Sequence, residues 1–290
     1  MKVILFGAGA SFGSELEGRV PPLGEQLFDE LAKFAPDTWG SLLPPWPERF
    51  RDNFEAAMSS FLIKGDFAAP YQWDMADFFY GEFQVTPTSA YVDLIRGLQQ
   101  HIKGIAFATL NYETLLFQAR DFSGVDEKHF SLCLPHGNAA LFCDNVSGNR
   151  GVTYSGHVAT SGRVRYFHDR REFIREKASN VFPPVMSYYE PSKFTVSGAN
   201  YIERERAKFK ALVEKADRVS VIGARVHAPD RHIWEPLATA RGTILYVSGV
   251  KGAKCFREWA ASEKRMGDIV LESHFRESIG RILEFMLKDS

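Results

Sequence analysis

Short apolar runs alternate with amphipathic segments along the chain, most regularly in its last third. The first run, residues 2–6 (KVILF), is β-branched and aromatic with no polar interruption, which is typical of a strand buried on both faces. The same pattern predicts further strands at 105–110, 129–134, 140–143, 164–167, 219–223, 243–247 and 268–271, and helices between them at 113–119, 169–177, 201–215, 231–239, 253–264 and 275–287. This alternation predicts an α/β fold with a doubly wound, Rossmann-like parallel sheet.

Helical spacing dominates the stretch between the first two predicted strands. Apolar residues at 23, 27, 28, 31 and 34 repeat with a helical period, and helices are predicted at 23–34, 47–63, 73–83 and 89–102. Four helices exceed what a simple crossover needs, so part of this stretch is interpreted as an insertion that could cover a ligand cleft. The predicted division is a core of residues 1–19 plus 104–290, a mainly helical insertion of residues 20–103, and an irregular, loop-rich segment of residues 144–200 that could form a small lid.

Composition narrows the class of protein. A formal net charge of -1 gives no indication of nucleic-acid binding, which usually needs a basic stripe. No apolar run approaches the roughly 18 residues of a membrane span, and only four apolar residues separate Lys2 from Gly7, so no secretory segment is visible. We therefore expect a cytoplasmic protein. The 24 phenylalanines indicate several packing layers or an oligomeric interface.

Metal-binding patterns are missing from the sequence. The three cysteines, Cys133, Cys143 and Cys255, form no Cys-x-x-Cys pair, so the chain has no four-cysteine zinc ribbon, and buried thiols in a reducing compartment are the simplest interpretation. The eight histidines show no metal-ligand spacing, and His227 and His232 are assigned to surface or cleft positions. No metal is predicted.

A glycine-rich turn follows the first predicted strand directly. Gly7-Ala8-Gly9-Ala10-Ser11 places backbone N–H groups and a helix N-terminus where a nucleotide diphosphate could bind, although a tight turn without ligand has the same sequence pattern. The dinucleotide fingerprint of dehydrogenases requires glycine at its sixth position, where Phe12 stands. It also requires an acidic residue after a second strand, where residues 23–34 form a predicted helix. Hydride transfer is therefore not predicted.

Polar residues follow several other predicted strands. Ligands of open α/β sheets bind at the carboxyl ends of the strands, so these residues are expected on one rim. They are Thr109, Asn111, Tyr112 and Glu113 after the second strand, His136 and Gly137 after the third, Gly223, Ala224, Arg225 and Asp230 after a later strand, and Ser248 after the next. Singly each is a weak signal, since Asn111 could cap a helix and His136 could be an ordinary core histidine.

Taken in order, these motifs resemble the sirtuin superfamily, specifically the sirtuin-like NAD-hydrolysing domains of bacterial antiphage defence. The family's Gly-Ala-Gly-x-Ser is matched at residues 7–11, its Thr-x-Asn-Tyr-Asp at 109–113, and its His-Gly at 136–137. An Ala-Asp before a strand that ends in Ile-Gly corresponds to residues 216–223, with Asp230 downstream. Two residues depart from the pattern: Glu113 replaces Asp, and Arg225 stands in a turn that more often reads Gly-Tyr-Ser.

The resemblance implies a reaction and a set of roles. NAD would be the substrate, cleaved between nicotinamide and ribose through an oxocarbenium-like state. His136 would be the general base, and Asn111 would orient water and the ribose. Gly7, Ala8, Gly9 and Ser11 would bind the diphosphate, and the remaining binding positions would be Thr109, Tyr112, Glu113, Gly137, Gly223, Ala224, Arg225, Asp230 and Ser248.

The resemblance also bears on partners and alternatives. Deacylating sirtuins usually carry a four-cysteine zinc module that this chain lacks, so hydrolysis is favoured over protein deacylation. A toxic effector of phage defence would have a defence-system partner protein and form a homo-oligomer. The alternatives are a catalytically weak module that binds NAD or ADP-ribose in a larger assembly, and an ADP-ribosyl transferase. Glu113 and Arg225 motivate the first of these alternatives.

Overall fold

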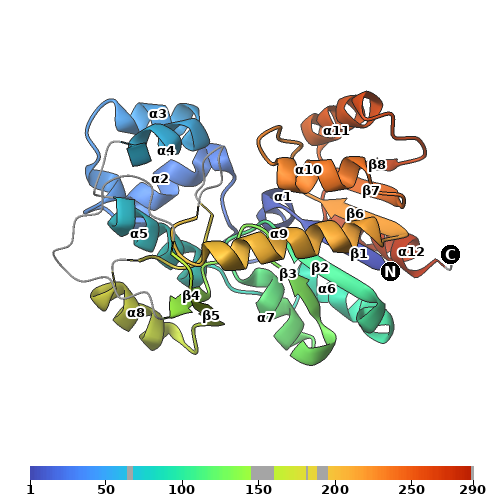
Figure 1. Ribbon diagram of the computed structural model, residues 1–290, viewed down its shortest axis with the longest axis horizontal. Coiled ribbons are helices and arrows are strands. Elements are labelled where there is room, and N and C mark those ends of the chain that lie inside the picture. The colour runs from blue at the N-terminus through green and yellow to red at the C-terminus, as the bar shows by residue number, and fades with distance from the viewer. Residues whose placement is uncertain (64–67, 145–159, 181, 188–194, 289–290) are drawn as a thin grey trace.

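A computed structural model of the chain describes residues 1–63, 68–144, 160–180, 182–187 and 195–288. Its centre is a six-stranded sheet with the strand order β3-β2-β1-β6-β7-β8, parallel at every pairing (Figure 1). The strands are β1 Lys2–Phe6, β2 Ile105–Thr109, β3 Ser131–Cys133, β6 Arg218–Ile222, β7 Thr243–Ser248 and β8 Ile269–Glu272. The predicted doubly wound, Rossmann-like sheet is confirmed.

Strand β1 occupies the centre of this sheet. It pairs in register with β2 on one side, from Lys2↔Ile105 onward, and with β6 on the other, from Lys2↔Arg218 onward. A strand with neighbours on both edges and helices on both faces must be apolar throughout, as KVILF is after its first residue. The strand order reverses between β1 and β6, and such a switch point is where open α/β sheets bind ligands.

Helices cover both faces of the sheet (Figure 1). Ile4 and Phe6 point into one hydrophobic core with α6, α7 and α12, whereas Val3 and Leu5 point into the other with α9, α10 and α11. The bounds are α6 Ala90–Leu98, α7 Leu115–Phe122, α9 Ala199–Glu214, α10 Arg231–Ala238, α11 Val250–Ser262 and α12 Ile279–Leu287. Shorter pieces are the helix α1 Ala8–Phe12 and the 3-10 turns Gln99–Gly104, Glu127–His129 and Arg276–Ser278.

A helical lobe lies beside the sheet, drawn at the upper left of Figure 1. It contains α2 Gly24–Phe34, α3 Trp46–Asp52, α4 Phe54–Ile63, α5 Ala68–Gly81 and the 3-10 turn Trp39–Ser41. Its interior is aromatic: the rings of Phe28 and Phe50 stack at 5.6 Å, and Trp39 packs on Phe50 and Phe54. Many of the chain's phenylalanines therefore form a packing layer of this lobe.

Two helices replace the single helix predicted over residues 47–63. Asn53 separates them in an extended conformation, and its Oδ1 accepts a hydrogen bond from Ala56 N at 3.0 Å. An asparagine side chain that satisfies the first N–H groups of a helix favours a new start over continuation. The prediction of one helix was wrong for this reason.

The helix α6 lies within the predicted insertion but packs with the core. It contacts α7 and α12, and its Tyr91 ring lies 5.0 Å from Phe6 of β1 and 5.2 Å from Phe275. Tyr91 is fully buried and reaches the carboxyl end of β1. A helix that sequence position assigns to the insertion thus contributes a side chain to the centre of the molecule.

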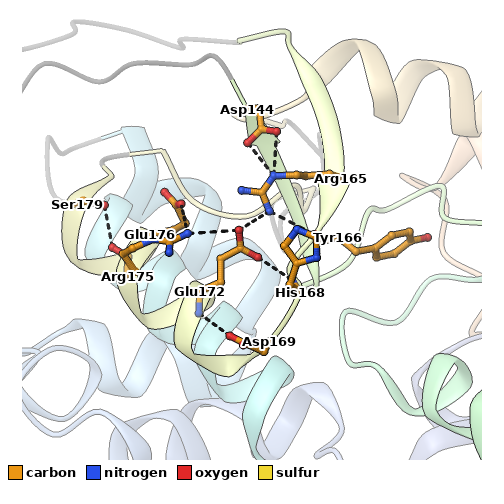
Figure 2. A network of polar contacts seen from close by, with 9 residues as sticks. All are labelled: Asp144, Arg165, Tyr166, His168, Asp169, Glu172, Arg175, Glu176 and Ser179. Atoms are coloured by element: carbon orange, nitrogen blue, oxygen red, sulfur yellow. Dashed lines mark hydrogen bonds and ion pairs between the residues drawn. The ribbon is translucent and has the colours of Figure 1, made fainter.

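A small antiparallel pair and a helix make up the third part of the molecule. β4 Leu141–Asp144 pairs with β5 Arg163–Tyr166, and α8 Arg170–Ser179 follows. Figure 2 shows how charge holds them together: the Arg165 guanidinium lies between Asp144 on β4 and Glu172 on α8, at 2.9 and 2.8 Å. Of the segment predicted as a lid, residues 145–159, 181 and 188–194 lie outside the described residues.

No helix in the described part of the chain is long and apolar enough to cross a membrane. Cys133 and Cys143 are buried, as expected, and Cys255 is half-buried; all three are free thiols.

Candidate functional site

Two glycine turns interlock at the switch point of the sheet. Gly7 N donates to Ile222 O and Gly9 N donates to Gly223 O, both at 2.9 Å. Gly223 has φ +63°, and a Cβ on it would lie 2.1 Å from Ala10 N. Glycine is therefore required at this contact for conformation and for space. These two N–H groups donate to the end of β6 and the turn after it, so they hold the two turns together. From the sequence, Gly7 and Gly9 were predicted to bind a diphosphate.

A buried polar network fills the space between the first glycine turn and the end of β2. Asn111 Nδ2 donates to Gly7 O at 3.2 Å and to Ser11 Oγ at 2.9 Å. Ser11 Oγ donates to Glu113 Oε1 at 2.6 Å and lies 2.7 Å from the hydroxyl of Tyr91. All four side chains are more than nine-tenths buried. The structure thus joins Asn111 and Glu113 at the Ser11 hydroxyl, and it adds Tyr91, a tyrosine that was not predicted as a site residue.

Burial perturbs the acidic groups of this network. It raises the pKa of the Glu113 carboxyl, although hydrogen bonds from Ser11 and from Leu115 N partly oppose the shift. Burial also raises the pKa of Tyr91 well above its usual value, and the nearby Glu113 adds to the effect. Since Leu115 N donates to Glu113 Oε2 at 2.6 Å, the carboxyl also fixes the first turn of α7. Glu113 therefore holds the turns in place from within the protein.

The side chain of Asn138 ties the ends of β2 and β3 together. Its Nδ2 donates to Glu113 O at 2.7 Å and to Asn111 O at 3.3 Å, and its Oδ1 accepts from Ala140 N at 2.9 Å. The residue is completely buried. Asn138 was not among the predicted site residues, although its position two residues after His136 was a signal.

Thr109 and Tyr112 stabilise the turn that carries Asn111 after β2. Thr109 Oγ1 accepts from Asn111 N at 3.1 Å, and the Tyr112 hydroxyl donates to Ser187 O at 2.8 Å. Ser187 N in turn donates to His136 O at 2.8 Å. Both predicted binding residues are buried, and both connect the strand-end turns to their surroundings.

His136 lies in the turn after β3, where Gly137 takes φ +74° and where a Cβ would lie 2.0 Å from Val185 O. Its Nε2 is 2.8 Å from the Nε2 of His232 and 3.8 Å from Asp230 Oδ1. Asp230 is the residue before the first turn of α10, and His232 is in that turn. The structure thus brings His136 and Asp230 together as the shared rim predicts. His232, assigned only to a surface or cleft position, is their direct neighbour.

The other predicted residues lie along the ends of β6 and β7. Ala224 is buried and accepts a hydrogen bond from the Tyr246 hydroxyl at 2.7 Å, Arg225 is exposed, and Ser248 is half-buried. A cavity of about 550 Å³ lies elsewhere, between α5, α7 and β5, and is lined by Tyr80 and Phe117 among others. None of the strand-end residues predicted as the site lines that cavity.

Comparison with known proteins gives structural likenesses only. No family model and no curated protein matches the chain. Among solved structures, it is similar to a Sir2 protein with p53 peptide and NAD+ (15% identity, TM-score 0.46, 98% of this chain and 92% of that chain). It is similar to Sir2Tm bound to a propionylated peptide (15% identity, TM-score 0.47, 98% and 92%). A Sir2 homologue in complex with ADP-ribose is also similar (14% identity, TM-score 0.44, 99% and 91%).

Proposed function

We propose that this protein is an NAD glycohydrolase that cleaves NAD to ADP-ribose and nicotinamide. The observation that carries the proposal is the placement of Asn111 and His136. They follow neighbouring strands, Asn138 fixes the backbone of one turn to the other, and Asn111 contacts the glycine turn at the switch point of the sheet. An amide, an imidazole and a glycine turn at one rim fit a reaction that needs positioning and a base.

Cleavage of NAD requires few further groups from the protein. Nicotinamide leaves as a neutral ring, so the reaction passes through an oxocarbenium-like ribose without a strong general acid. Asn111 would orient the ribose and the attacking water, and His136 would take the proton of that water as the new C–O bond forms. Ser11, Tyr91 and Glu113 hold the Asn111 amide through the buried network, which is the pre-organisation such a step requires.

The substrate's diphosphate would bind at the exposed part of the same rim. Ala8 is exposed at the start of α1, and Arg225 is exposed on the neighbouring turn after β6. A guanidinium suits phosphate because its planar donors match two oxygens at once. On this proposal, the departure at Arg225 supplies charge that the glycine turn lacks, since two of its N–H groups are used in packing.

Nicotinamide release from NAD by the purified protein tests the proposal. Wild type, Asn111→Ala, His136→Ala and the control His101→Ala are compared at equal folded concentration. His101 is exposed and lies in the 3-10 turn that leads into β2, at the opposite end of that strand from Asn111. Loss of a positioned base typically costs about 10²–10⁴ in rate, and misplacing the substrate costs about 10². We expect both site variants to fall by such factors and His101→Ala to match wild type.

A wild-type rate equal to that of both site variants would overturn the proposal. NAD or ADP-ribose binding by calorimetry without turnover would then support the second candidate, a binding module. The close pairing of a buried His136 with His232 favours that candidate, because it engages the ring nitrogen that a base would use. Labelled ADP-ribose attached to protein instead of free in solution would indicate a transferase.

The same proposal extends to a biological role. The motif resemblance supports a cytoplasmic, oligomeric effector that depletes NAD during phage infection, in concert with a partner protein. Cells that carry the wild-type chain are expected to lose NAD on infection, whereas cells with His136→Ala keep it. Equal NAD levels in both strains would remove the defence role and leave the enzymatic proposal to the assay above.

A further inference from the structure

We propose that His136, Asp230 and His232 form a binding site for a divalent transition-metal ion such as Zn²⁺. One potential ligand atom from each residue lies within 4.8 Å of the other two. His136 and Asp230 are buried and His232 is half-buried, so the group lies inside the rim of the sheet. His136 lies far from Asp230 and His232 in the sequence. The fold joins the three residues because it brings the turn after β3 against the start of α10.

The donor set matches a known class of site. Two imidazoles and one carboxylate suit Zn²⁺ and related transition metals, and three protein ligands leave further positions for water. The two Nε2 atoms are 2.8 Å apart, and Asp230 Oδ1 is 3.8 Å from His136 Nε2. Two nitrogens at about 2.1 Å from one ion lie about 3.4 Å apart at the tetrahedral angle that Zn²⁺ prefers, so the two rings need to separate by about 0.6 Å.

Metal binding requires a change of tautomer. In the metal-free pair, one ring nitrogen donates to the other, so a proton lies between the two Nε2 atoms. A metal ion requires both Nε2 lone pairs, so that proton moves to Nδ1 of its own ring and both imidazoles stay neutral. The site thus places two nitrogen donors against each other with a carboxylate beside them.

Neighbouring groups hold the ligands in position. Ser187 N donates to His136 O, and the positive φ of Gly137 fixes the turn that carries the ring. The second oxygen of Asp230 lies 3.6 Å from His227 Nδ1, and His227 Nε2 lies 3.2 Å from Glu55 Oε2 on α4. Such outer contacts orient metal ligands and typically change affinity by about 10- to 100-fold when removed.

A metal ion here would also control the proposed reaction. Its bond to His136 Nε2 occupies the lone pair that would accept the proton of water, so the loaded protein lacks its base. This part rests on the proposed function, whereas the binding site does not. Zinc would then be an inhibitor of the hydrolase, and removal of zinc would activate it.

Competition for Zn²⁺ with a chromophoric chelator tests the site without any assay of activity. Metal-stripped wild type is expected to bind one Zn²⁺, and Co²⁺ in its place to give visible absorption typical of nitrogen and oxygen ligands. His232→Ala and Asp230→Asn should each weaken binding more than about tenfold. His101→Ala, with the same chemical change at an exposed position, should bind as wild type does.

Binding of equal strength in His232→Ala and His101→Ala, or no binding by wild type, would overturn the site. His232→Gln, checked by circular dichroism, replaces His232→Ala if that variant does not fold. In the NAD assay, Zn²⁺ should inhibit wild type and act on His232→Ala only at higher concentration. Zn²⁺ binding that leaves the rate of NAD cleavage unchanged or raises it would refute the inhibition. Absence of NAD cleavage by metal-free wild type would refute the proposed hydrolase and would leave the result on Zn²⁺ binding intact.

Discussion

Glu113 shows how one methylene more than the expected aspartate is accommodated. Its carboxyl accepts hydrogen bonds from Ser11 Oγ and Leu115 N and is almost completely buried. The longer side chain therefore reaches the start of α7 and the glycine-turn helix at once. Burial raises the pKa of this carboxyl, so the folded protein holds the proton to higher pH than the unfolded chain does.

Replacement of Glu113 by Gln is expected to change how stability depends on pH. As pH rises above the pKa of Glu113 in the unfolded chain, the unfolded chain loses this proton while the folded protein keeps it. The free energy of unfolding of wild type therefore falls with pH until the folded pKa is passed. The variant lacks this loss. Urea unfolding at about pH 5 and about pH 8 should show Glu113→Gln gaining relative to wild type at the higher pH.

Glu17→Gln is the matched control, because Glu17 is exposed. Its free energy of unfolding relative to wild type should stay nearly constant between the two pH values. A Glu113→Gln difference that is also constant, or that moves in favour of wild type with pH, would contradict a raised pKa at this position.

At the scale of elements, the two turns after β1 and β6 behave as one unit. Gly9 N bonds to Gly223 O, and the missing side chain of Gly223 allows the helix α1 to approach. The strand pairing of β1 with β6 and this contact support each other, because both fix the same spacing between the two strand ends. Changes here are expected to act on the fold and on the rim together.

Gly223→Ala is predicted to destabilise the protein much more than Gly124→Ala. Both glycines have positive φ, +63° and +67°, so both variants incur a backbone cost of about 1–2 kcal/mol. Only at Gly223 does the new Cβ collide, 2.1 Å from Ala10 N, whereas Gly124 faces open space. Overpacking adds about 1–3 kcal/mol, measurable by urea unfolding. Equal losses in the two variants would mean that the turns do not interlock.

Periodicity predicted most elements because apolar alternation reflects burial directly. The strands and helices of the last third appear where the pattern places them, with ends shifted by a few residues. The pattern could not locate the break at Asn53, since a side chain that caps a new helix leaves the apolar period unchanged. The hydrogen bond of Asn53 thus starts a new helix although the apolar period continues through it.

Strand-end positions predicted a shared rim, and the structure places Ser11 against Asn111 and Glu113 and places His136 near Asp230. They did not predict the residues that support these groups. In the sequence, Tyr91 looks like an ordinary core residue of a helix, although its hydroxyl contacts Ser11. Asn138 makes its hydrogen bonds to the turn after β2 through main-chain oxygens. His232 meets His136 only because α10 returns to the end of β3. The contacts of Tyr91 and His232 join distant segments, and no local pattern encodes them.

The whole molecule has a contact that joins the helical lobe to the sheet. Glu55 at the start of α4 reaches His227 in the loop after β6, at 3.2 Å, and His227 contacts Asp230. Both Glu55 and His227 are partly exposed, so the contact contributes modestly to stability. Because His227 also contacts Asp230, this contact links the helical lobe to the rim of the sheet.

Glu55→Ala is predicted to loosen the loop of residues 223–230 between β6 and α10. Loss of a contact worth about 0.2–1 kcal/mol should speed amide hydrogen exchange in that loop by up to about fivefold, with little change in β1. Mass spectrometry of the exchanged protein measures this. Glu48→Ala, at an exposed position of α3, is the control and should leave the loop unchanged. An identical exchange pattern in the two variants would show that the contact does not restrain the loop.

The central place of β1 has a consequence for synthesis. β1 must wait for β6, its neighbour from Arg218 onward, before both of its edges are paired and the glycine turns can meet. At about 5–20 residues per second, a ribosome needs roughly 10–40 s to translate the stretch from β1 to β6. A nascent chain therefore carries no assembled rim until β6 has been translated.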